Sequence, residues 1–285
     1  MEAKLIDGKD IATKIKEELI PELKDIKAKG IIPRLEAVIV GENQGAKIYA
    51  GNQDKACKEL SISYKLNELP ESTSQDQLIG FIQQLNENPK VTGIILLMPV
   101  PSHINAREVQ MKICPSKDVE GIHPFNIGKL VYGEAVIAPC TALAVMELLK
   151  STNVCLKGKE VVIVGHSEII GKPLTLLLLQ SRLESPTPTI CHIATKDLAF
   201  HIKRADILIV AVGKVGLITG DMLKEGAIVI DVGINKVDDK IVGDVVFDEA
   251  VKKASFITPV PGGVGPVTTA MLLKNTVEAA KNIGK

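Results

Sequence analysis

The fold is decided by one junction, Val161-Val162-Ile163-Val164-Gly165-His166-Ser167-Glu168-Ile169-Ile170-Gly171-Lys172-Pro173. Its four β-branched residues predict a buried strand, and the apolar run after Pro173 predicts a helix. A glycine turn at the carboxyl end of a buried strand lets backbone amides and a helix N-terminus face a pyrophosphate. The pattern is Gly-x-Ser-x-x-x-Gly rather than the usual Gly-x-Gly-x-x-Gly. A plain turn between a strand and a helix is therefore the alternative interpretation.

Further glycine turns follow other apolar strands, at Gly213, Gly216 and Gly233. In an open α/β sheet, ligands bind outside the carboxyl ends of the strands. Several glycine turns at that edge therefore favour a dinucleotide site.

The residues that select between NAD and NADP usually follow the second strand of such a site, where an acid holds a ribose diol and a base holds a phosphate. Here the segment Cys191-His192-Ile193-Ala194-Thr195-Lys196 contains no acid, and the first one is Asp197. His166 and Lys196 are the candidate partners of a 2′-phosphate. The alternative is that both are solvated surface residues.

Around this junction, short β-rich runs alternate with amphipathic helical patterns, which predicts parallel sheets with crossover helices. The expected strands are Leu35–Val40, Ile62–Leu66, Gly93–Leu97, Glu160–Val164, Thr189–His192, Asp206–Val210 and Ala227–Asp231. The expected helices are Ile11–Ile26, Tyr49–Leu60, Gln75–Leu85, Thr141–Leu149, Ile170–Gln180 and Val267–Ala280. The stretch Met98–Ile137 is expected to form loops with one short helix.

The fold class expected is α/β, with two α/β domains and a cleft between them, the second a Rossmann-like doubly wound parallel sheet. The boundary lies near Pro139–Thr141, which gives a first domain at residues 1–139 and a dinucleotide-binding domain at 140–266. The last helix, about 267–285, is expected to return and pack on the first domain.

Composition is that of an ordinary soluble globular protein and argues against nucleic-acid-binding and membrane proteins. The 285 residues carry 34 basic and 34 acidic side chains, so no strong field gathers nucleic acid or anionic membrane. The charged N-terminus lacks the apolar core of a signal peptide, and the apolar runs are shorter than the roughly 20 residues of a membrane span. The five cysteines and the histidines show no metal-ligand spacing, so no metal site is expected. A cytoplasmic location is the simplest expectation.

Motifs along nearly the whole chain resemble the bifunctional methylenetetrahydrofolate dehydrogenase/methenyltetrahydrofolate cyclohydrolase family. They are Tyr49 with Lys55-Ala56-Cys57, Met98-Pro99-Val100-Pro101, Lys117-Asp118-Val119-Glu120-Gly121 with His123-Pro124, Pro139-Cys140-Thr141, Gly165-x-Ser167, Val229-Ile230-Asp231-Val232-Gly233-Ile234-Asn235, and Thr258-Pro259-Val260-Pro261-Gly262-Gly263-Val264-Gly265-Pro266. The last two are long and nearly unbroken, which makes the match specific.

The resemblance implies oxidation of 5,10-methylenetetrahydrofolate with NADP, or less often NAD, followed by hydrolysis of the methenyl product to 10-formyltetrahydrofolate. It also implies a homodimer with the active site between the domains. The catalytic positions it assigns are Tyr49, Gln53, Leu97 and Glu120. The folate-binding positions are Tyr49, Glu120, Pro261, Gly262, Gly263, Pro266 and Thr268. The cofactor-binding positions are Gly165, His166, Ser167, Gly213, Gly233 and Ile234.

Several positions depart from the family pattern. The family lysine, four residues after the tyrosine and on the same helical face, is here Gln53, whereas Lys55 is two positions further on. The polar partner of that lysine, a glutamine, is here Leu97. The folate-anchoring aspartate is Glu120, and arginines often used on the 2′-phosphate are replaced by His166 and by Ile193-Ala194.

These departures predict a dehydrogenase whose cyclohydrolase activity is weak or absent, because hydrolysis needs a titratable group and hydride transfer does not. Leucine at position 97 fits this prediction, because an amide without the lysine would be buried and unsatisfied. Three alternatives stay open: a bifunctional enzyme that uses another base such as Lys55, a non-catalytic folate- or nucleotide-binding paralogue, and an unrelated nicotinamide dehydrogenase.

Overall fold

The computed structural model describes residues 2–282, which form two compact units. Unit 1 contains residues up to Thr13 together with Thr141–Thr268, and unit 2 contains Lys14–Cys140 together with the residues from Thr269 onward. The two α/β units agree with the fold class expected from the sequence. Residues 2–13 lie in unit 1 because the short strand β1 (Lys4–Leu5) pairs with β11 (Phe256–Ile257).

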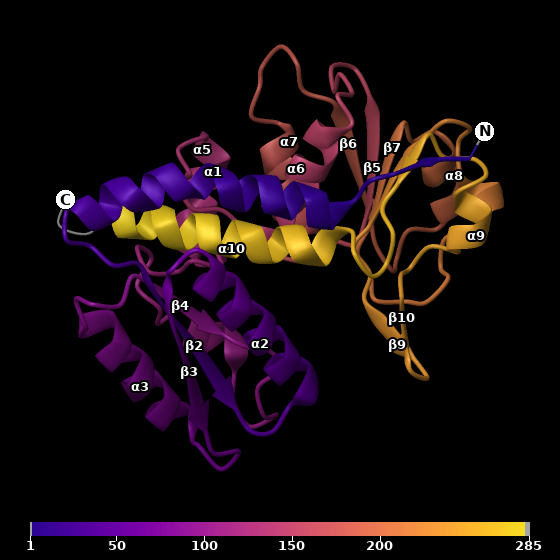
Figure 1. Ribbon diagram of the computed structural model, residues 1–285. Helices are drawn as coiled ribbons and strands as arrows, with labels where there is room; N and C mark the ends of the chain where they lie inside the picture. Colours follow the sequence, from indigo (N-terminus) through magenta and orange to yellow (C-terminus); the bar gives the residue numbers. More distant parts are fainter. Residues whose placement is uncertain (1, 283–285) are drawn as a thin grey trace. The chain divides into compact units, whose positions relative to one another are not determined.

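Unit 2 is built on a three-stranded parallel sheet in the order β3-β2-β4 (Figure 1). Its strands are β2 (Arg34–Val40), β3 (Ser63–Leu69) and β4 (Gly93–Leu96). Its helices are α2 (Gln44–Glu59), α3 (Gln75–Glu87), α4 (Ala106–Gln110) and α5 (Pro124–Tyr132), with most of α1 (Gly8–Ala28) and α10 (Val264–Lys281). The expectation of one short helix in Met98–Ile137 was wrong: two form, and Pro124 opens α5 in the first turn, where its missing N–H costs nothing.

The last helix belongs to unit 2 from Thr269 onward. Figure 1 shows α10 running beside α1, and an ion pair of 2.7 Å between Lys281 and Glu22 joins the two helices. The helix begins at Val264, three residues before the expected start, because Pro266 is tolerated within the first helical turn.

Unit 1 is built on a six-stranded sheet in the order β1-β11-β8-β7-β5-β6, with every pairing parallel. Its other strands are β5 (Glu160–Val164), β6 (Thr187–Cys191), β7 (Ile207–Val210) and β8 (Ile228–Asp231), and a separate hairpin is formed by β9 (Asn235–Val237) and β10 (Lys240–Val242). Its helices are α6 (Cys140–Ser151), α7 (Gly171–Leu178), α8 (Leu198–Lys203), α9 (Phe247–Ala250) and a 3₁₀ turn, Gly220–Met222.

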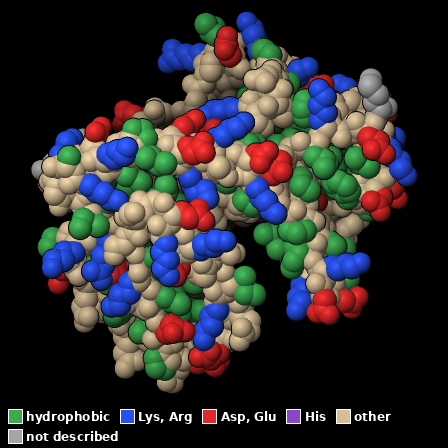
Figure 2. Space-filling view, viewed as in Figure 1, with side chains coloured by type: hydrophobic (Ala, Val, Ile, Leu, Met, Phe, Trp, Pro, Cys, Tyr) green, Lys and Arg blue, Asp and Glu red, His purple; other side chains and the backbone are tan. Residues whose placement is uncertain are grey.

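Each of the two parallel sheets buries an aliphatic core, in keeping with a chain that has no tryptophan and only 3% aromatic residues. In unit 1 the core joins Val162, Leu208 and Val229 to helix residues such as Ile202 and Ala250. In unit 2, Val38 packs with residues of α3 and β4, including Ile82 and Ile94. Lysine and arginine side chains alternate with acidic ones over the face shown in Figure 2. Within residues 2–282, no helix combines the length and apolar character that a membrane span needs.

Candidate active site

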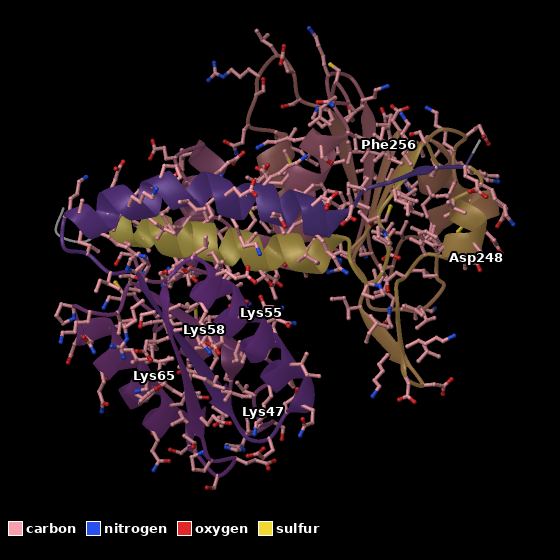
Figure 3. The ribbon with its side chains drawn as sticks, in the orientation of Figure 1. Lys47, Lys55, Lys58, Lys65, Asp248 and Phe256 are labelled. Carbon is pink, nitrogen blue, oxygen red and sulfur yellow. The ribbon has the colours of Figure 1, made fainter. Side chains whose placement is uncertain are left out.

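Helix α2 places Tyr49 and Gln53 on one face, one helical turn apart. The helix starts five residues before the expected Tyr49 because the Asn43 side chain caps it, accepting a hydrogen bond from the Ala46 backbone N–H at 2.9 Å. Gln53 is fully buried, whereas Lys55, labelled on α2 in Figure 3, is exposed. Two residues beyond Gln53 on the helix, Lys55 therefore does not share the buried face of Gln53.

The Gln53 amide has one satisfied and one unsatisfied end. The Tyr64 hydroxyl on β3 donates a hydrogen bond of 3.1 Å to Gln53 Oε1, but Gln53 Nε2 has no hydrogen-bond partner. Burial, and then the nearby Cys140 and Glu120, hold the pKa of Tyr49 above its usual value, and a weaker opposing effect comes from the Gln53 side chain. Tyr49, Gln53 and Tyr64 thus form one set of neutral polar groups.

Glu120 lies on a turn held by its neighbour Asp118. The buried Asp118 carboxylate accepts hydrogen bonds from Gly121 N, His123 N and Asn126 Nδ2, at 3.2, 2.8 and 2.9 Å. Burial, assisted by the charge of Asp118, raises the pKa of Glu120 from 4.5 to about 8. Glu120 therefore titrates within the ordinary assay range, unlike a solvated carboxylate.

Leu97 follows β4 directly, and its side chain is fully buried. Its backbone N–H donates to Val38 O at 2.8 Å, which extends the sheet by one residue. Because its side chain has no polar atom, Leu97 takes no part in the polar interactions around Tyr49.

Two members of this neighbourhood, Tyr64 and Asn275, were missed by the sequence reasoning. Asn275 on α10 donates from Nδ2 to Val119 O and Ala138 O, at 2.8 and 2.9 Å, and so fixes the chain just before Glu120 and just before Cys140. An asparagine within the apolar run of α10 was a usable signal, because a buried amide needs partners. The alternation of exposed and less exposed side chains along β3 gave no comparable indication that Tyr64 binds a buried amide.

In unit 1, β6 lies on one side of β5, and β7 and β8 follow on the other side, so the strand order of the sheet reverses between β5 and β7. Ligands of doubly wound folds bind at this point. Gly165 follows β5 with a φ of +118°, and a Cβ there would lie 2.3 Å from Ala211 O. Only glycine therefore fits, and the predicted turn is built as a close approach of two backbones. Ser167 lies in this turn and accepts from Ile170 N through Oγ, at 3.2 Å.

The buried Asp244 holds the neighbouring glycine turns in place. The Asp244 carboxylate accepts from Val212 N, Gly213 N and Lys214 N, at 2.8, 3.0 and 2.8 Å. A Cβ on Gly233 would lie 2.3 Å from Asp244 Cγ, which explains the glycine there. The sequence reasoning placed Gly213 and Gly233 at this edge but missed Asp244. Ile234, the next candidate, is exposed beside them.

His166 and His192 meet at the ends of adjacent strands. Their rings make an edge-to-face contact with centroids 4.9 Å apart. The Ala194 N–H donates to His192 Nδ1 at 3.2 Å, so the imidazole can present its Nε2–H outward. Lys196 is exposed on the same loop, and Asp197 caps α8 by accepting from Phe200 N at 2.9 Å.

The remaining candidates lie in unit 1, on the segment that runs from the end of β11 into the first turns of α10. The peptide bond before Pro261 is cis, and the Gly8 N–H donates to Gly262 O at 3.0 Å. Gly263 packs closely on Thr258 and Pro259. Pro266 lies in the first turn of α10, where Thr268 Oγ1 donates to Val264 O at 3.1 Å.

Comparison with known proteins agrees with these two units. The family model of the tetrahydrofolate dehydrogenase/cyclohydrolase catalytic domain matches residues 6–120, and that of the NAD(P)-binding domain matches residues 139–283. The bifunctional protein FolD of Nautilia profundicola is 49% identical over 282 residues, which are 99% of this chain and 98% of the relative.

Solved structures give the same result. The bifunctional FolD methylenetetrahydrofolate dehydrogenase/cyclohydrolase of Campylobacter jejuni has a TM-score of 0.94 at 46% identity, over 98% of this chain and 99% of that one. The Trypanosoma brucei methylenetetrahydrofolate dehydrogenase-cyclohydrolase, complexed with NADP and an inhibitor, has a TM-score of 0.93 at 40% identity, over 99% and 98% of the two chains. The chain therefore belongs to the tetrahydrofolate dehydrogenase/cyclohydrolase family.

Proposed function

We propose that this chain oxidises 5,10-methylenetetrahydrofolate to 5,10-methenyltetrahydrofolate with NADP, or with NAD as a second choice, and that its cyclohydrolase activity is weak or absent. Family membership and the NADP bound by the Trypanosoma brucei relative support the oxidation. The observation that carries the second part is Gln53, fully buried on the Tyr49 face of α2.

The two reactions make different chemical demands. Hydride transfer leaves a cation that the flanking folate nitrogens stabilise, so orientation of the reactants is the main requirement. Hydrolysis needs water attack and proton removal, for which general acid–base catalysis is worth about two to four powers of ten. The Gln53 amide cannot take up a proton, and Lys55 is exposed.

The turns of unit 1 fit a dinucleotide. NADP, when bound, supplies the hydride acceptor. We propose that Gly165, Ser167, Gly213, Gly233 and Ile234 hold it. The support is the backbone approach at Gly165 and the turns ordered by Asp244, since side chains there would fill the space that a pyrophosphate needs.

The 2′-phosphate is assigned to His166, with His192 beside it. No acid competes for a ribose diol on the loop after β6 until Asp197, whose carboxylate already caps α8. Imidazole N–H groups at the ends of β5 and β6 favour a phosphate over a diol there.

Folate binding is assigned to Tyr49 and Glu120 in unit 2. In unit 1 we assign it to one segment, comprising Pro261, Gly262, Gly263, Pro266 and Thr268. We further propose a homodimer, which sedimentation equilibrium tests directly. These assignments rest on membership of the family and on the residues of this chain that stand at its motif positions.

A second candidate function, the full bifunctional reaction, is favoured by one observation. The pKa of Glu120, raised to about 8 by burial, gives the site a group that can exchange protons near neutrality. If Glu120 replaces the missing lysine as the base, methenyl hydrolysis rises with pH through about 8, and Glu120→Gln abolishes it.

The test follows both products on one enzyme sample. Methylenetetrahydrofolate-dependent reduction of NADP and NAD is recorded first, and decay of the methenyl absorbance second. The proposal expects NADP reduction and methenyl decay at the uncatalysed rate. Hydrolysis close to the dehydrogenase rate would refute the loss of cyclohydrolase activity. No reduction of either cofactor would indicate a binding protein without catalysis.

A further inference from the structure

The amide of Gln53 is unusual because it is buried without full hydrogen bonding. Its side chain is fully inaccessible to solvent, and its Nε2 atom has no partner among the described residues. Leaving a buried donor unpaired costs free energy that an apolar residue of similar size avoids. Such a group in an enzyme calls for an explanation, and a hydrogen bond formed only with a ligand supplies one.

The surroundings of Gln53 on α2 provide no substitute partner. The residues three and seven positions earlier on the same helical face, Ala50 and Ala46, are both buried and have no polar side-chain atom. Tyr49, one turn earlier, lies close enough for a weak hydrogen-bond interaction with the Gln53 side chain to lower the pKa of Tyr49 slightly, but no contact of Gln53 Nε2 reaches full hydrogen-bond geometry. The free amino group therefore lies beside the tyrosine that we assign to folate binding.

Tyr64 determines which end of the amide is free. It lies on β3 opposite Leu35 of β2, and its hydroxyl donates to Gln53 Oε1 at 3.1 Å. Burial raises the pKa of Tyr64, so the phenol keeps its proton and remains a donor at neutral pH. Since this donor holds the carbonyl end, the amino end is the one left without a hydrogen-bond partner.

We propose that Tyr64 is a positioning residue that orients the Gln53 amide. In this orientation, Gln53 Nε2 donates a hydrogen bond to an acceptor atom of the bound reduced folate. This inference rests on the proposed function. The site thereby uses a neutral donor that orients the substrate where the family lysine would supply a charge. This role needs no proton transfer and is compatible with hydride transfer alone.

The experiment measures folate binding separately from catalysis. Titration calorimetry with tetrahydrofolate gives a dissociation constant without any hydride transfer, and steady-state kinetics give KM and kcat for methylenetetrahydrofolate and NADP. The variants are Tyr64→Phe, Gln53→Met and the double variant. The controls are Tyr132→Phe, at an exposed tyrosine, and Gln44→Leu, at an exposed position of α2.

Both single variants should weaken tetrahydrofolate binding and raise the folate KM by about 3- to 10-fold, the value of one neutral hydrogen bond. The KM for NADP should stay unchanged, and the double variant should be no worse than Gln53→Met, because the two residues act as one unit. Gln53→Met should also raise the melting temperature of the free protein while reducing the additional stabilisation given by tetrahydrofolate.

Three results would overturn the inference: folate binding unchanged in both single variants, additive losses in the double variant, or no tetrahydrofolate binding by the wild-type protein. Failure of the proposed function gives a different pattern. In that case the wild type reduces no NADP or hydrolyses the methenyl product rapidly, whatever the binding data show.

Discussion

Glu120→Gln should change how the stability of the protein depends on pH. In the folded protein, burial beside Asp118 raises the pKa of Glu120 from 4.5 to about 8. Between these two values the folded state binds more protons than the unfolded state, so the free energy of unfolding falls as the pH rises. The destabilisation is absent below about pH 4.5 and complete above about pH 8. Glutamine cannot ionise and removes this dependence.

The magnitude follows from the pKa difference. One pKa unit corresponds to about 1.4 kcal/mol, so the full difference sets an upper limit of about 5 kcal/mol. Glu120 keeps partial contact with solvent, which stabilises the charged form, and a penalty of about 1–3 kcal/mol is the realistic expectation. Urea denaturation at pH 5, 6, 7, 8 and 9 measures it for the wild type and for Glu120→Gln.

The variant should gain stability relative to the wild type progressively from pH 5 to pH 8, with no further gain above about pH 8.5. Glu134→Gln, at an exposed carboxyl of the same unit, is the matched control and should show no such trend. A difference between Glu120→Gln and the wild type that is constant across the pH range would refute the reasoning, because it would mean that Glu120 is ionised throughout.

Three further predictions concern groups that hold the two units in shape. Asp244→Asn should weaken NADP binding about 10-fold or more, because the three backbone amides of the turn after β7 lose their acceptor. Titration with NADP measures the affinity, and the control Asp239→Asn, at an exposed site, should leave it unaltered. Asn275→Leu should lower the free energy of unfolding by about 2–4 kcal/mol, because two buried carbonyls lose their donor; a loss under 0.5 kcal/mol in urea denaturation would contradict this. Lys117→Met should cost about 2–3 kcal/mol in the same assay, because its ammonium group binds three carbonyls at the C-terminal end of α3; exposed Lys112→Met is the control.

Regular elements of the fold were predictable because each is encoded locally. The β-branched run at Val161–Val164 and the periodic apolar residues of α1 give the correct element types, with boundaries off by a few residues where caps decide them. The short strands β1 and β11 were not predictable, because two residues carry no periodicity and the strands exist only through pairing between distant segments.

The same distinction applies to the candidate site. Gln53 and Leu97 could be singled out because a motif fixes their positions along the chain. The partners of Tyr64, Asp244 and Asn275 could not be predicted, because they lie 11 to 156 residues away in sequence. Hydrogen bonds between buried side chains and remote backbone atoms leave no periodic signature, although a polar residue within an apolar run is a warning that such a bond exists.

The departures that the family resemblance implies at positions 53, 97 and 120 are consistent with one another on electrostatic grounds. A lysine at position 53 would place a cation near Tyr49 and Glu120 and would hold the pKa of that carboxyl down. With a neutral amide there, burial and the charge of Asp118 act on Glu120 without an opposing cation, and its pKa rises to about 8. If position 97 would otherwise hold the polar partner of that lysine, as the resemblance implies, then the buried apolar side chain of Leu97 avoids an unsatisfied amide. In the function that we propose, the site orients the folate with neutral hydrogen-bond donors and carries, in exchange for the lysine that the resemblance implies, a carboxyl that is largely neutral at pH 7. That exchange favours hydride transfer, which depends on orientation, over hydrolysis, which depends on a base of the right pKa.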